Sequence, residues 1–203
     1  VPKTFLLDNH YDMNNFQNEH SSKKIYILKK NLQNKKGIKI IYGDLGHILD
    51  NKEDYLLIQE FIKNKDEQYV LRLYILGILR DNNLELYCNS HHKVLYAKKG
   101  ELITDSKYIH NIKKKIDLGN LKKIFDELKY IFKKQIQNNL PKLIKFQLFG
   151  IDIKYDEYMN PYLLEINKNP NMNNYHNAEE KILKKNLLED ICNSVIKKDE
   201  KNS

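Results

Sequence analysis

Three side chains with oxygen donors lie close together where two apolar segments follow each other in the C-terminal half of the sequence. Asp152 belongs to segment 146–155, and Glu165 and Asn167 belong to segment 161–167. Side chains alternate between the two faces of a strand, so a hairpin that pairs Asp152 with Glu165 places all three on one face. Two carboxylates and an amide oxygen suit Mg²⁺ better than Zn²⁺. The spacing therefore predicts a magnesium site on a hairpin.

The same register predicts that the other face of this hairpin is buried. Three pairs of bulky side chains would meet on it, namely Ile151 with Ile166, Ile153 with Leu164, and Tyr155 with Tyr162. Residues 157–160 would remain as a loop of a length that hairpins permit. An Asp and a Glu on neighbouring strands more often belong to a solvated surface, but the apolar flanks and the polar turn at 167–171 favour the metal site.

The rest of the sequence predicts a mixture of strands and helices. Strands are expected at 25–29, 38–42, 56–62, 69–79 and 84–88. Helical spacing of apolar residues predicts helices at 121–136 and 178–196, and a short helix is expected at 45–51. The apolar face of the last long helix would carry Ile182, Leu187, Leu188, Ile191 and Val195. Residues 1–22, 31–36 and 89–118 are expected to be mostly irregular.

This element order indicates an α+β chain with mostly antiparallel strands. Residues 1–22 would be a connecting segment, 23–62 a small nucleotide-binding lobe, and 63–203 a larger lobe with the metal site. A nucleotide would be gripped between the two lobes.

The composition restricts the partners and the compartment. The chain has 203 residues and a formal net charge of +8, which favours acidic partners such as an acidic peptide, anionic lipid or nucleic acid. Abundant Lys, Asn, Ile and Tyr are equally typical of an A- and T-rich genome, so both explanations of the charge stay open. No apolar run is long enough to span a membrane. Cys88 and Cys192 are far apart in sequence, which predicts reduced thiols in a cytoplasmic protein.

Several short segments occur in an order that is typical of one enzyme family. They are residues 1–5, the strand 25–29 followed by Gly37 and Ile38, segments 59–62 and 71–76, Phe-Gln-Leu-Phe-Gly-Ile-Asp at 146–152, and Leu-Glu-Ile-Asn at 164–167. Together they resemble the catalytic part of the tubulin–tyrosine ligase family over nearly the whole chain. The resemblance implies the ATP-grasp fold, in which two lobes with mostly antiparallel sheets hold ATP.

The resemblance also implies an activity. Such an enzyme is an ATP- and Mg²⁺-dependent carboxylate–amine ligase, in which ATP phosphorylates a carboxylate and an amine then displaces the phosphate. The expected reaction adds free tyrosine, glutamate or glycine to an acidic protein tail, with tubulin as the expected partner and an association with microtubules.

The resemblance assigns roles to individual residues. Asp152, Glu165 and Asn167 would hold Mg²⁺, and Arg72 would be catalytic, facing the transferring phosphoryl group or the acyl phosphate. The remaining residues would contact the nucleotide: Lys29 and Lys36 its phosphates, Gln59, Glu60, Phe61 and Ile62 its adenine, with Thr104 nearby. Each of these residues also has an interpretation without a function. Lys29 would then be an exposed lysine at a strand end, residues 59–62 a buried strand, and Arg72 an arginine on a solvated face.

Departures from the family pattern leave other functions open. The pattern Lys-Phe-Asp-x-Arg is replaced by Gln68, Tyr69, Val70, Leu71 and Arg72. A family arginine that holds the incoming amino acid aligns with Tyr96, and a Thr-Asn pair appears as Thr104 and Asp105. One alternative is a degenerate member that binds ATP or acidic tubulin tails without turnover. Another is an ATP-grasp ligase for a small free acid. Nucleic-acid binding is not expected, because arginines are scarce.

Overall fold

The computed structural model describes residues 1–30, 37–43, 46, 50, 54–80, 83–89, 92–99, 101–102, 104–112, 121–136, 145–168, 170–172 and 177–196. The chain divides into two units, Val1–Ile62 and Lys63–Ser203, which are described separately. Each unit contains one sheet, and the strand pairs between the described residues are antiparallel. The architecture is therefore α+β with two antiparallel sheets, as the sequence predicted.

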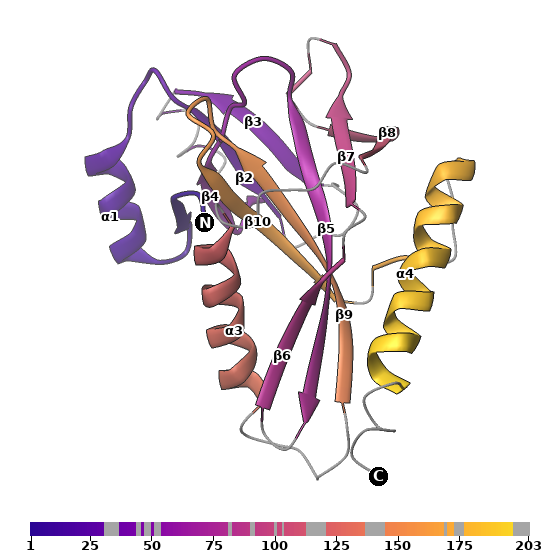
Figure 1. The fold of residues 1–203 in the computed structure, drawn as a ribbon. Coiled ribbons are helices and arrows are strands. Elements are labelled where there is room, and N and C mark those ends of the chain that lie inside the picture. Colours follow the sequence, from indigo (N-terminus) through magenta and orange to yellow (C-terminus); the bar gives the residue numbers. More distant parts are fainter. Residues whose placement is uncertain are drawn as a thin grey trace. The chain divides into compact units, whose positions relative to one another are not determined.

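The described part of the first unit contains a four-stranded sheet, with helix α1 (His10–Glu19) packed beside it (Figure 1). In spatial order the strands are β1 (Thr4–Leu6), β4 (Leu57–Glu60), β2 (Ile25–Lys29) and β3 (Ile38–Tyr42). The buried core of the unit consists of Leu7, Phe16, Tyr26, Leu28, Ile41 and Ile58. The strands predicted at 25–29, 38–42 and 56–62 are confirmed, the last in a shorter form.

Helix α1 (His10–Glu19) corrects the prediction that residues 1–22 are irregular. The Asn9 side chain caps it by accepting hydrogen bonds from the amides of Tyr11 and Asp12 at 3.0 and 3.1 Å. Phe16 is the residue that the helix buries, and its ring packs edge-on against Tyr26. One buried position provides no apolar periodicity, so this helix is stabilised by its cap and by tertiary contacts that the sequence pattern does not reveal.

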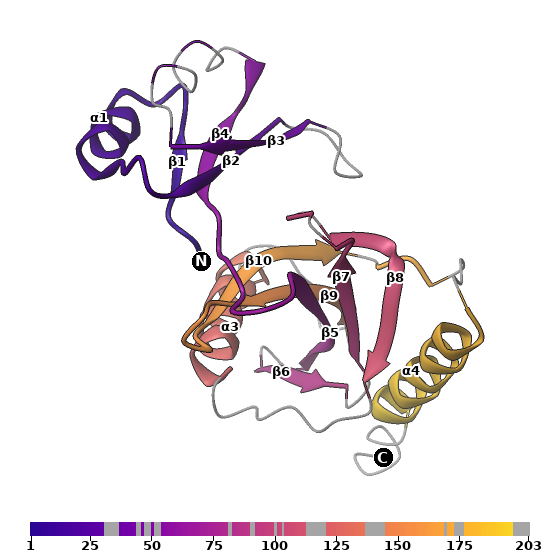
Figure 2. The same ribbon diagram turned by 90° about the horizontal axis from the view of Figure 1, so that it is seen from above.

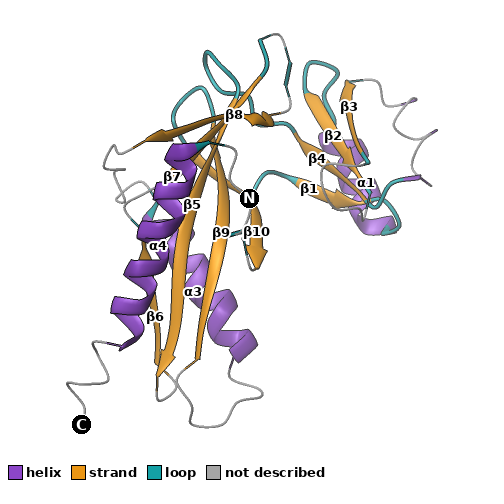
Figure 3. Ribbon diagram, turned by 90° about the vertical axis from the view of Figure 1, so that its right-hand side faces the viewer, coloured by secondary structure: helices purple, strands orange, loops and turns teal. Residues whose placement is uncertain are grey.

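The second unit is built on a six-stranded sheet. The order is β10 (Pro161–Lys168), β9 (Lys145–Tyr155), β5 (Tyr69–Arg80), β7 (His92–Ala97) and β8 (Thr104–Ile112), and β6 (Asn83–Cys88) also pairs with β5. Figure 3 shows β5 and β9 running side by side through the middle of this sheet. The strands predicted at 69–79 and 84–88 and the hairpin 146–167 are confirmed.

The expectation that residues 89–118 are mostly irregular is wrong, because β7 and β8 lie there. Strand β7 buries two polar side chains, His92 and Lys93, so its sequence lacks the apolar alternation that marks a strand. These residues are stabilised by partners distant in sequence, such as Glu180 for Lys93.

Two helices lie on opposite faces of the larger sheet (Figures 1 and 2). Helix α3 (Lys122–Ile136) packs against the face that carries Leu71, Leu73 and Ile75. Helix α4 (Ala178–Ile196) packs against the other face, where Leu183 and Leu187 contact Tyr74. Both helices were predicted with nearly these bounds.

The predicted buried face of α4 is wrong in part. Ile182 and Leu188 are exposed, whereas Glu180, Leu183, Lys184 and Leu187 are buried. Two of these four residues are charged, so the apolar pattern alone does not identify the whole buried face, although Leu187 and Ile191 belong to it as predicted.

Some predictions concern residues that the structure does not describe. The predicted loop 31–36, most of the short helix expected at 45–51, and Lys36 lie outside the described residues. Among the described helices, none combines the length and the apolar character that crossing a bilayer requires.

Candidate functional site

The hairpin of β9 and β10 brings two of the predicted ligands together. Asp152 is the register partner of Glu165, and Ile151 is the partner of Ile166, as the sequence predicted. Residues that are paired across an antiparallel ladder share a face, so both carboxylates project from the same side of the sheet.

A β-bulge shifts the register between Leu163 and Glu165. Ile153 pairs with Leu163 instead of Leu164, so that Leu164 is the extra residue between Leu163 and Glu165. The predicted pairs Ile153–Leu164 and Tyr155–Tyr162 are therefore wrong. Tyr162 instead pairs with Lys154, which moves its ring to the face that carries Asp152.

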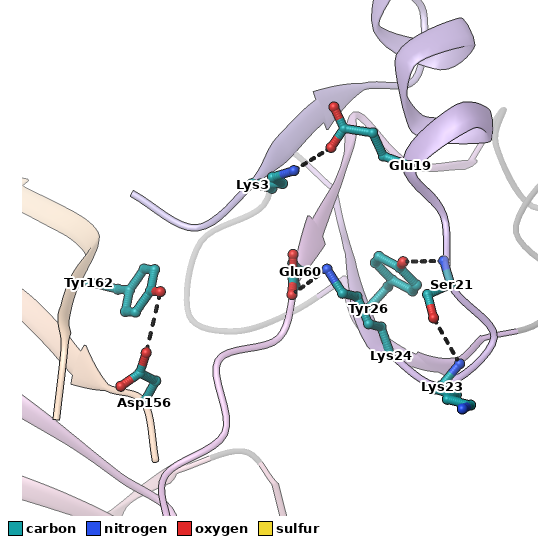
Figure 4. A network of polar contacts seen from close by, with 9 residues as sticks. All are labelled: Lys3, Glu19, Ser21, Lys23, Lys24, Tyr26, Glu60, Asp156 and Tyr162. Carbon is teal, nitrogen blue, oxygen red and sulfur yellow. Dashed lines mark hydrogen bonds and ion pairs between the residues drawn. The ribbon is translucent and has the colours of Figure 1, made fainter. Parts of the chain in front are cut away.

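The turn of the hairpin is organised by Asp156, which directly follows β9. Its carboxylate accepts hydrogen bonds from the amides of Tyr158 and Asn160 at 2.9 and 2.8 Å, and from the Asn160 side chain at 2.9 Å. The Tyr162 hydroxyl lies 3.4 Å away (Figure 4). Partial burial raises the pKa of Asp156, but the hydrogen bonds from Asn160, Tyr158 and Tyr162 outweigh it, so the net pKa is lowered. The ionised carboxylate therefore stabilises the turn.

Arg72 lies opposite Asp152 on the neighbouring strand β5. Its Nε and Nη2 atoms donate to Oδ1 and Oδ2 of Asp152, each at 2.6 Å. Burial by itself would lower the pKa of Arg72. The hydrogen bonds and the negative charge of Asp152 outweigh this effect, so the net pKa is raised and the guanidinium stays charged. The anionic partner that a half-buried arginine needs is thus Asp152, within the chain itself.

Asn167, the third predicted ligand, has an unsatisfied polar atom. Its Nδ2 atom is buried and has no hydrogen-bond partner. The oxygen and nitrogen of an amide are interchangeable by a flip, so an oxygen can face the same direction. An oxygen in this direction would fit a cation bound beside Asp152 and Glu165.

Gly150 provides the space between Asn167 and Arg72. A Cβ atom at Gly150 would lie 3.7 Å from both Asn167 Cβ and Arg72 Cδ, and 3.2 Å from Pro170 Cβ. Asn167 is also the register partner of Gly150. Arg72 and Asn167 therefore flank the same small gap on the face of Asp152.

Among the described residues, no three side chains of the His, Cys, Asp or Glu type gather as a metal site. A cation at this face would therefore need the amide of Asn167 in addition to Asp152 and Glu165. This donor set contains only oxygen atoms and fits Mg²⁺.

A row of charges crosses the sheet at the level of Asp152. Register partners on four adjacent strands are Glu165, Asp152, Arg72 and Lys93. Because cross-strand partners share a face, two carboxylates and two cations stand side by side.

Lys93 connects this row to helix α4. Its ammonium forms a buried ion pair with Glu180, and Lys184 Nζ lies 3.2 Å from the same carboxylate oxygen. Burial lowers the pKa of Lys93, and its hydrogen bond to Glu180 opposes that effect. Asn177 caps the first turn of α4 by accepting a hydrogen bond from the Glu180 amide at 2.8 Å. The start of α4 is thereby fixed against the strand next to Arg72.

Lys154 is a second buried cation on this face. It follows Asp152 by two residues on β9, and it is 4% exposed. Burial lowers the pKa of Lys154 to about 8.

In the first unit, the predicted phosphate ligand Lys29 is held by a predicted adenine contact. Lys29 Nζ donates to Gln59 Oε1 at 2.7 Å, and Gln59 Nε2 donates to Thr4 Oγ1 at 2.8 Å. Gln59 is buried, so it fixes the direction of the lysine. The hydrogen bond to Gln59 therefore holds the Lys29 side chain in one direction.

The neighbouring residues of segment 59–62 are also engaged within the unit. Glu60 forms an ion pair with Lys24 at 2.9 Å (Figure 4). The amides of Glu60 and Phe61 donate to the carbonyls of Lys3 and Ile25. These two amides are thus committed to the small sheet, and Ile62, which is half-buried, is the last residue of the unit. The predicted contacts with adenine stay a prediction.

Tyr96 lies on the face opposite Arg72. It is the register partner of Tyr69, and both rings pack against the cluster that contains Leu71 and Val94. Tyr96 thus does not replace the aligned family arginine within the charged row. The β7 residue in that row is Lys93. Thr104 begins β8 opposite Ala97, and its side chain is not among those described.

A model of the tubulin-tyrosine ligase family matches residues 82–203, which is more than half of the chain. The chain belongs to this family. Its members are ATP-grasp ligases that join amino acids to tubulin-like substrates at the expense of ATP. The matched part of the family contains Asp152, Glu165 and Asn167, whereas Lys29 and Arg72 precede it.

Sequence reasoning missed three buried charged residues that belong to this part of the family fold, namely Lys93, Glu180 and Lys184. A signal existed for Glu180, because Asn177 followed three residues later by a glutamate is a helix-start pattern. Lys154 could also have been found, since strand alternation places it on the face of Asp152. Lys93 had no such signal, because its strand was not predicted.

Proposed function

We propose that this chain is an ATP- and Mg²⁺-dependent carboxylate–amine ligase that adds tyrosine, glutamate or glycine to an acidic protein tail, with tubulin as the acceptor. In this reaction ATP phosphorylates a carboxylate, and the amine of the incoming group displaces the phosphate to form an amide bond. Family membership supports the reaction class.

The observation that carries the proposal is the grouping of Asp152, Glu165 and Asn167 beside Arg72. The two carboxylates are register partners, and the Asn167 amide has an unsatisfied atom. Bound Mg²⁺ would neutralise charge on phosphate oxygens in the phosphoryl step. Asp152, Glu165 and Asn167 would hold the ion through oxygen atoms.

Arg72 would stabilise charge on the transferring group. A guanidinium has five N–H donors, and Asp152 accepts two of them in a fixed geometry. The remaining donors would bind an anionic oxygen without any rearrangement of the side chain, which is the property that makes electrostatic stabilisation effective. Lys29, oriented by Gln59, would add a point charge for a phosphate.

The matched test compares Glu165→Gln with Glu157→Gln, because Glu157 is exposed in the turn of the same hairpin. We expect Mg²⁺-dependent ATP binding and incorporation of labelled Tyr, Glu or Gly into tubulin in the native chain. Glu165→Gln should lower turnover about 100- to 1000-fold, and Glu157→Gln should leave it unchanged. Equal activity of the two variants would eliminate the proposed metal site.

The second candidate is a family member that binds ATP or acidic tubulin tails without turnover. Two observations favour it. Val70 contributes an apolar side chain on the face of Arg72, and Tyr96 points to the opposite face. Nucleotide binding without incorporation of any of the three amino acids would support this candidate, whereas incorporation would exclude it.

The positive charge of the chain supports an acidic acceptor. A net charge of +8 would attract a polyanionic tail over a distance, and salt would weaken this attraction. A cytoplasmic location with an association with microtubules follows from the same proposal.

A further inference from the structure

Lys93 lies near the proposed metal site along the sheet, but it is bound by helix α4. Its register partner is Arg72, and Arg72 is in turn the register partner of Asp152. Adjacent strands are about 4.8 Å apart, so the backbones of Lys93 and Asp152 are separated by about 10 Å, and both side chains project from one face. The Lys93 ammonium forms its ion pair with Glu180, in the first turn of α4. Two carboxylates therefore lie in the neighbourhood of one ammonium.

The electrostatics of Lys93 show that both carboxylates act on it. Burial lowers the pKa of Lys93, and the hydrogen bond and charge of Glu180 oppose that effect. The charges of Arg72 and Asp152 also act on this pKa, and that of Asp152 raises it. Without the charge of Glu180, the attraction by Asp152 would remain, and it would draw the ammonium toward the metal site.

Glu180 is well fixed for holding Lys93 on the side of α4. Its side chain is buried, and its amide donates to the Asn177 side chain that caps the helix. Lys184 Nζ lies 3.2 Å from the carboxylate oxygen that binds Lys93. The Lys93 ammonium also lies over the ring of Tyr74, 5.8 Å from its centroid. The ammonium is thus held between the carboxylate and an aromatic ring.

The direction of Lys93 matters for a cation at Asp152. A carboxylate offers about four lone-pair positions, and Arg72 donates to both oxygens of Asp152. A metal ion would use a remaining position. An ammonium at the same carboxylate would occupy that position and would repel a divalent cation.

We propose that Glu180 is a positioning residue for the metal site, because it holds the Lys93 ammonium toward α4 and so keeps it from competing with Mg²⁺ for Asp152. This inference rests on the proposed function, in which Asp152 is a Mg²⁺ ligand. Glu180 itself does not touch the metal ion. Its effect on the ion passes through Lys93.

The test measures Mn²⁺, a paramagnetic substitute for Mg²⁺, by electron paramagnetic resonance of the free ion, with and without a non-hydrolysable ATP analogue. Glu180→Gln should weaken Mn²⁺ binding about tenfold. Adding Lys93→Met to this variant should restore the native affinity within about threefold. Adding Lys184→Met instead should leave binding weak, because Lys93 then still lacks the charge of Glu180.

The two double variants are a matched pair. Each replaces the same carboxylate and one of the two buried lysines that share it, so each retains one buried lysine of the pair. A purely structural role of Glu180 predicts the same Mn²⁺ affinity for both. Their comparison also carries the test if Glu180→Gln alone does not fold. Urea unfolding verifies that each variant is folded at the temperature of the titration.

Two single variants complete the experiment. Lys93→Met should bind Mn²⁺ at least as tightly as the native chain, because it removes the competing ammonium. Weaker binding in this variant would mean that Lys93 supports the site, and it would overturn the inference. Glu179→Gln is the surface control, because Glu179 is exposed beside Glu180, and it should leave the affinity unchanged.

The outcomes separate this inference from the proposed function. If the native chain binds no Mn²⁺, with or without the ATP analogue, the proposed metal site fails. If the native chain binds Mn²⁺ and the two double variants bind it equally well, only the role of Glu180 is refuted. Native affinity in Glu180→Gln would refute that role as well.

Discussion

Arg72 and Asp152 are register partners on β5 and β9, and their side chains meet through two parallel hydrogen bonds of 2.6 Å. This fork geometry fixes the planes of both groups. It also places a permanent cation beside a carboxylate that we propose as a Mg²⁺ ligand. Each carboxylate oxygen has a second lone pair, so Asp152 can accept from Arg72 and still face a cation. The pair thus joins the proposed metal ligand to the proposed catalytic arginine.

Arg72→Met should destabilise the fold. The change leaves the buried Asp152 carboxylate without its cation, which costs about 3–5 kcal/mol at a fully buried pair. The Arg72 side chain is 28% exposed, so we expect about 1–3 kcal/mol. Urea unfolding measures the loss. Lys185→Met is the control, because Lys185 and Glu189 form an exposed pair, and it should change stability by less than about 0.5 kcal/mol. Equal effects of the two changes would contradict the importance of the fork.

Glu180→Gln should be more damaging than the same change at the preceding residue. Glu180 neutralises two buried lysines, Lys93 and Lys184, which would repel each other without it. We expect a loss of about 3–5 kcal/mol in the free energy of unfolding. Glu179 is exposed in the same helical turn, and Glu179→Gln should change it by less than about 0.5 kcal/mol. A small effect of Glu180→Gln would show that the buried cluster does not fix the start of α4.

Gly150→Ala should disturb the gap between Arg72 and Asn167. The new methyl group would lie 3.2 Å from the rigid ring of Pro170, and we expect a loss of about 1–3 kcal/mol. Gly77→Ala on β5 is the matched control. Its methyl group would lie 3.4 Å from the Phe149 ring, an ordinary contact, so the reduced freedom of the unfolded chain should make the change neutral or stabilising. Thermal unfolding of both variants checks the expected difference, and a stabilised Gly150→Ala would contradict it.

Cys88 should be a poorly reactive thiol. Burial raises its pKa from 9.0 to about 11, so at pH 8 the thiolate population is about 100-fold smaller than in the unfolded chain. A thiol reagent should therefore label the exposed Cys192 first, and label Cys88 quickly only in urea. Rapid labelling of both cysteines in the folded chain would contradict the buried environment.

The same pKa shift predicts a dependence of stability on pH. Between about pH 9 and 11 the unfolded chain has lost the Cys88 proton while the folded chain retains it, so this contribution to stability decreases as the pH rises. Cys88→Ala should remove the decrease. An unchanged pH dependence in this variant would argue against the shift.

The elements that the sequence predicted well have regular side-chain patterns. Strand β5 and helix α3 each bury one continuous apolar series, such as Leu71, Leu73 and Ile75 on β5. Strand alternation also predicted that Asp152 and Glu165 share a face. These patterns depend on the repeat of a single element, so no knowledge of the neighbouring elements was needed.

The elements that were missed are stabilised by partners distant in sequence. Helix α1 buries Phe16 alone, and β7 buries His92 and Lys93 in place of apolar residues. The bulge at Leu164 leaves the apolar pattern of β10 intact, so nothing in the sequence indicates where the register shifts. In each case the stabilising contact comes from another element.

The sequence by itself determined the antiparallel α+β class, the two long helices and the common face of Asp152 and Glu165. It also contained the segments by which the family could be recognised. The tertiary structure alone decided that Arg72 pairs with Asp152, that Tyr96 points away from them, and that Lys93 and Glu180 are buried together. The physical reason is that the repeat of one strand or helix determines which side chains share a face, whereas the partner of a buried charge depends on which elements pack together.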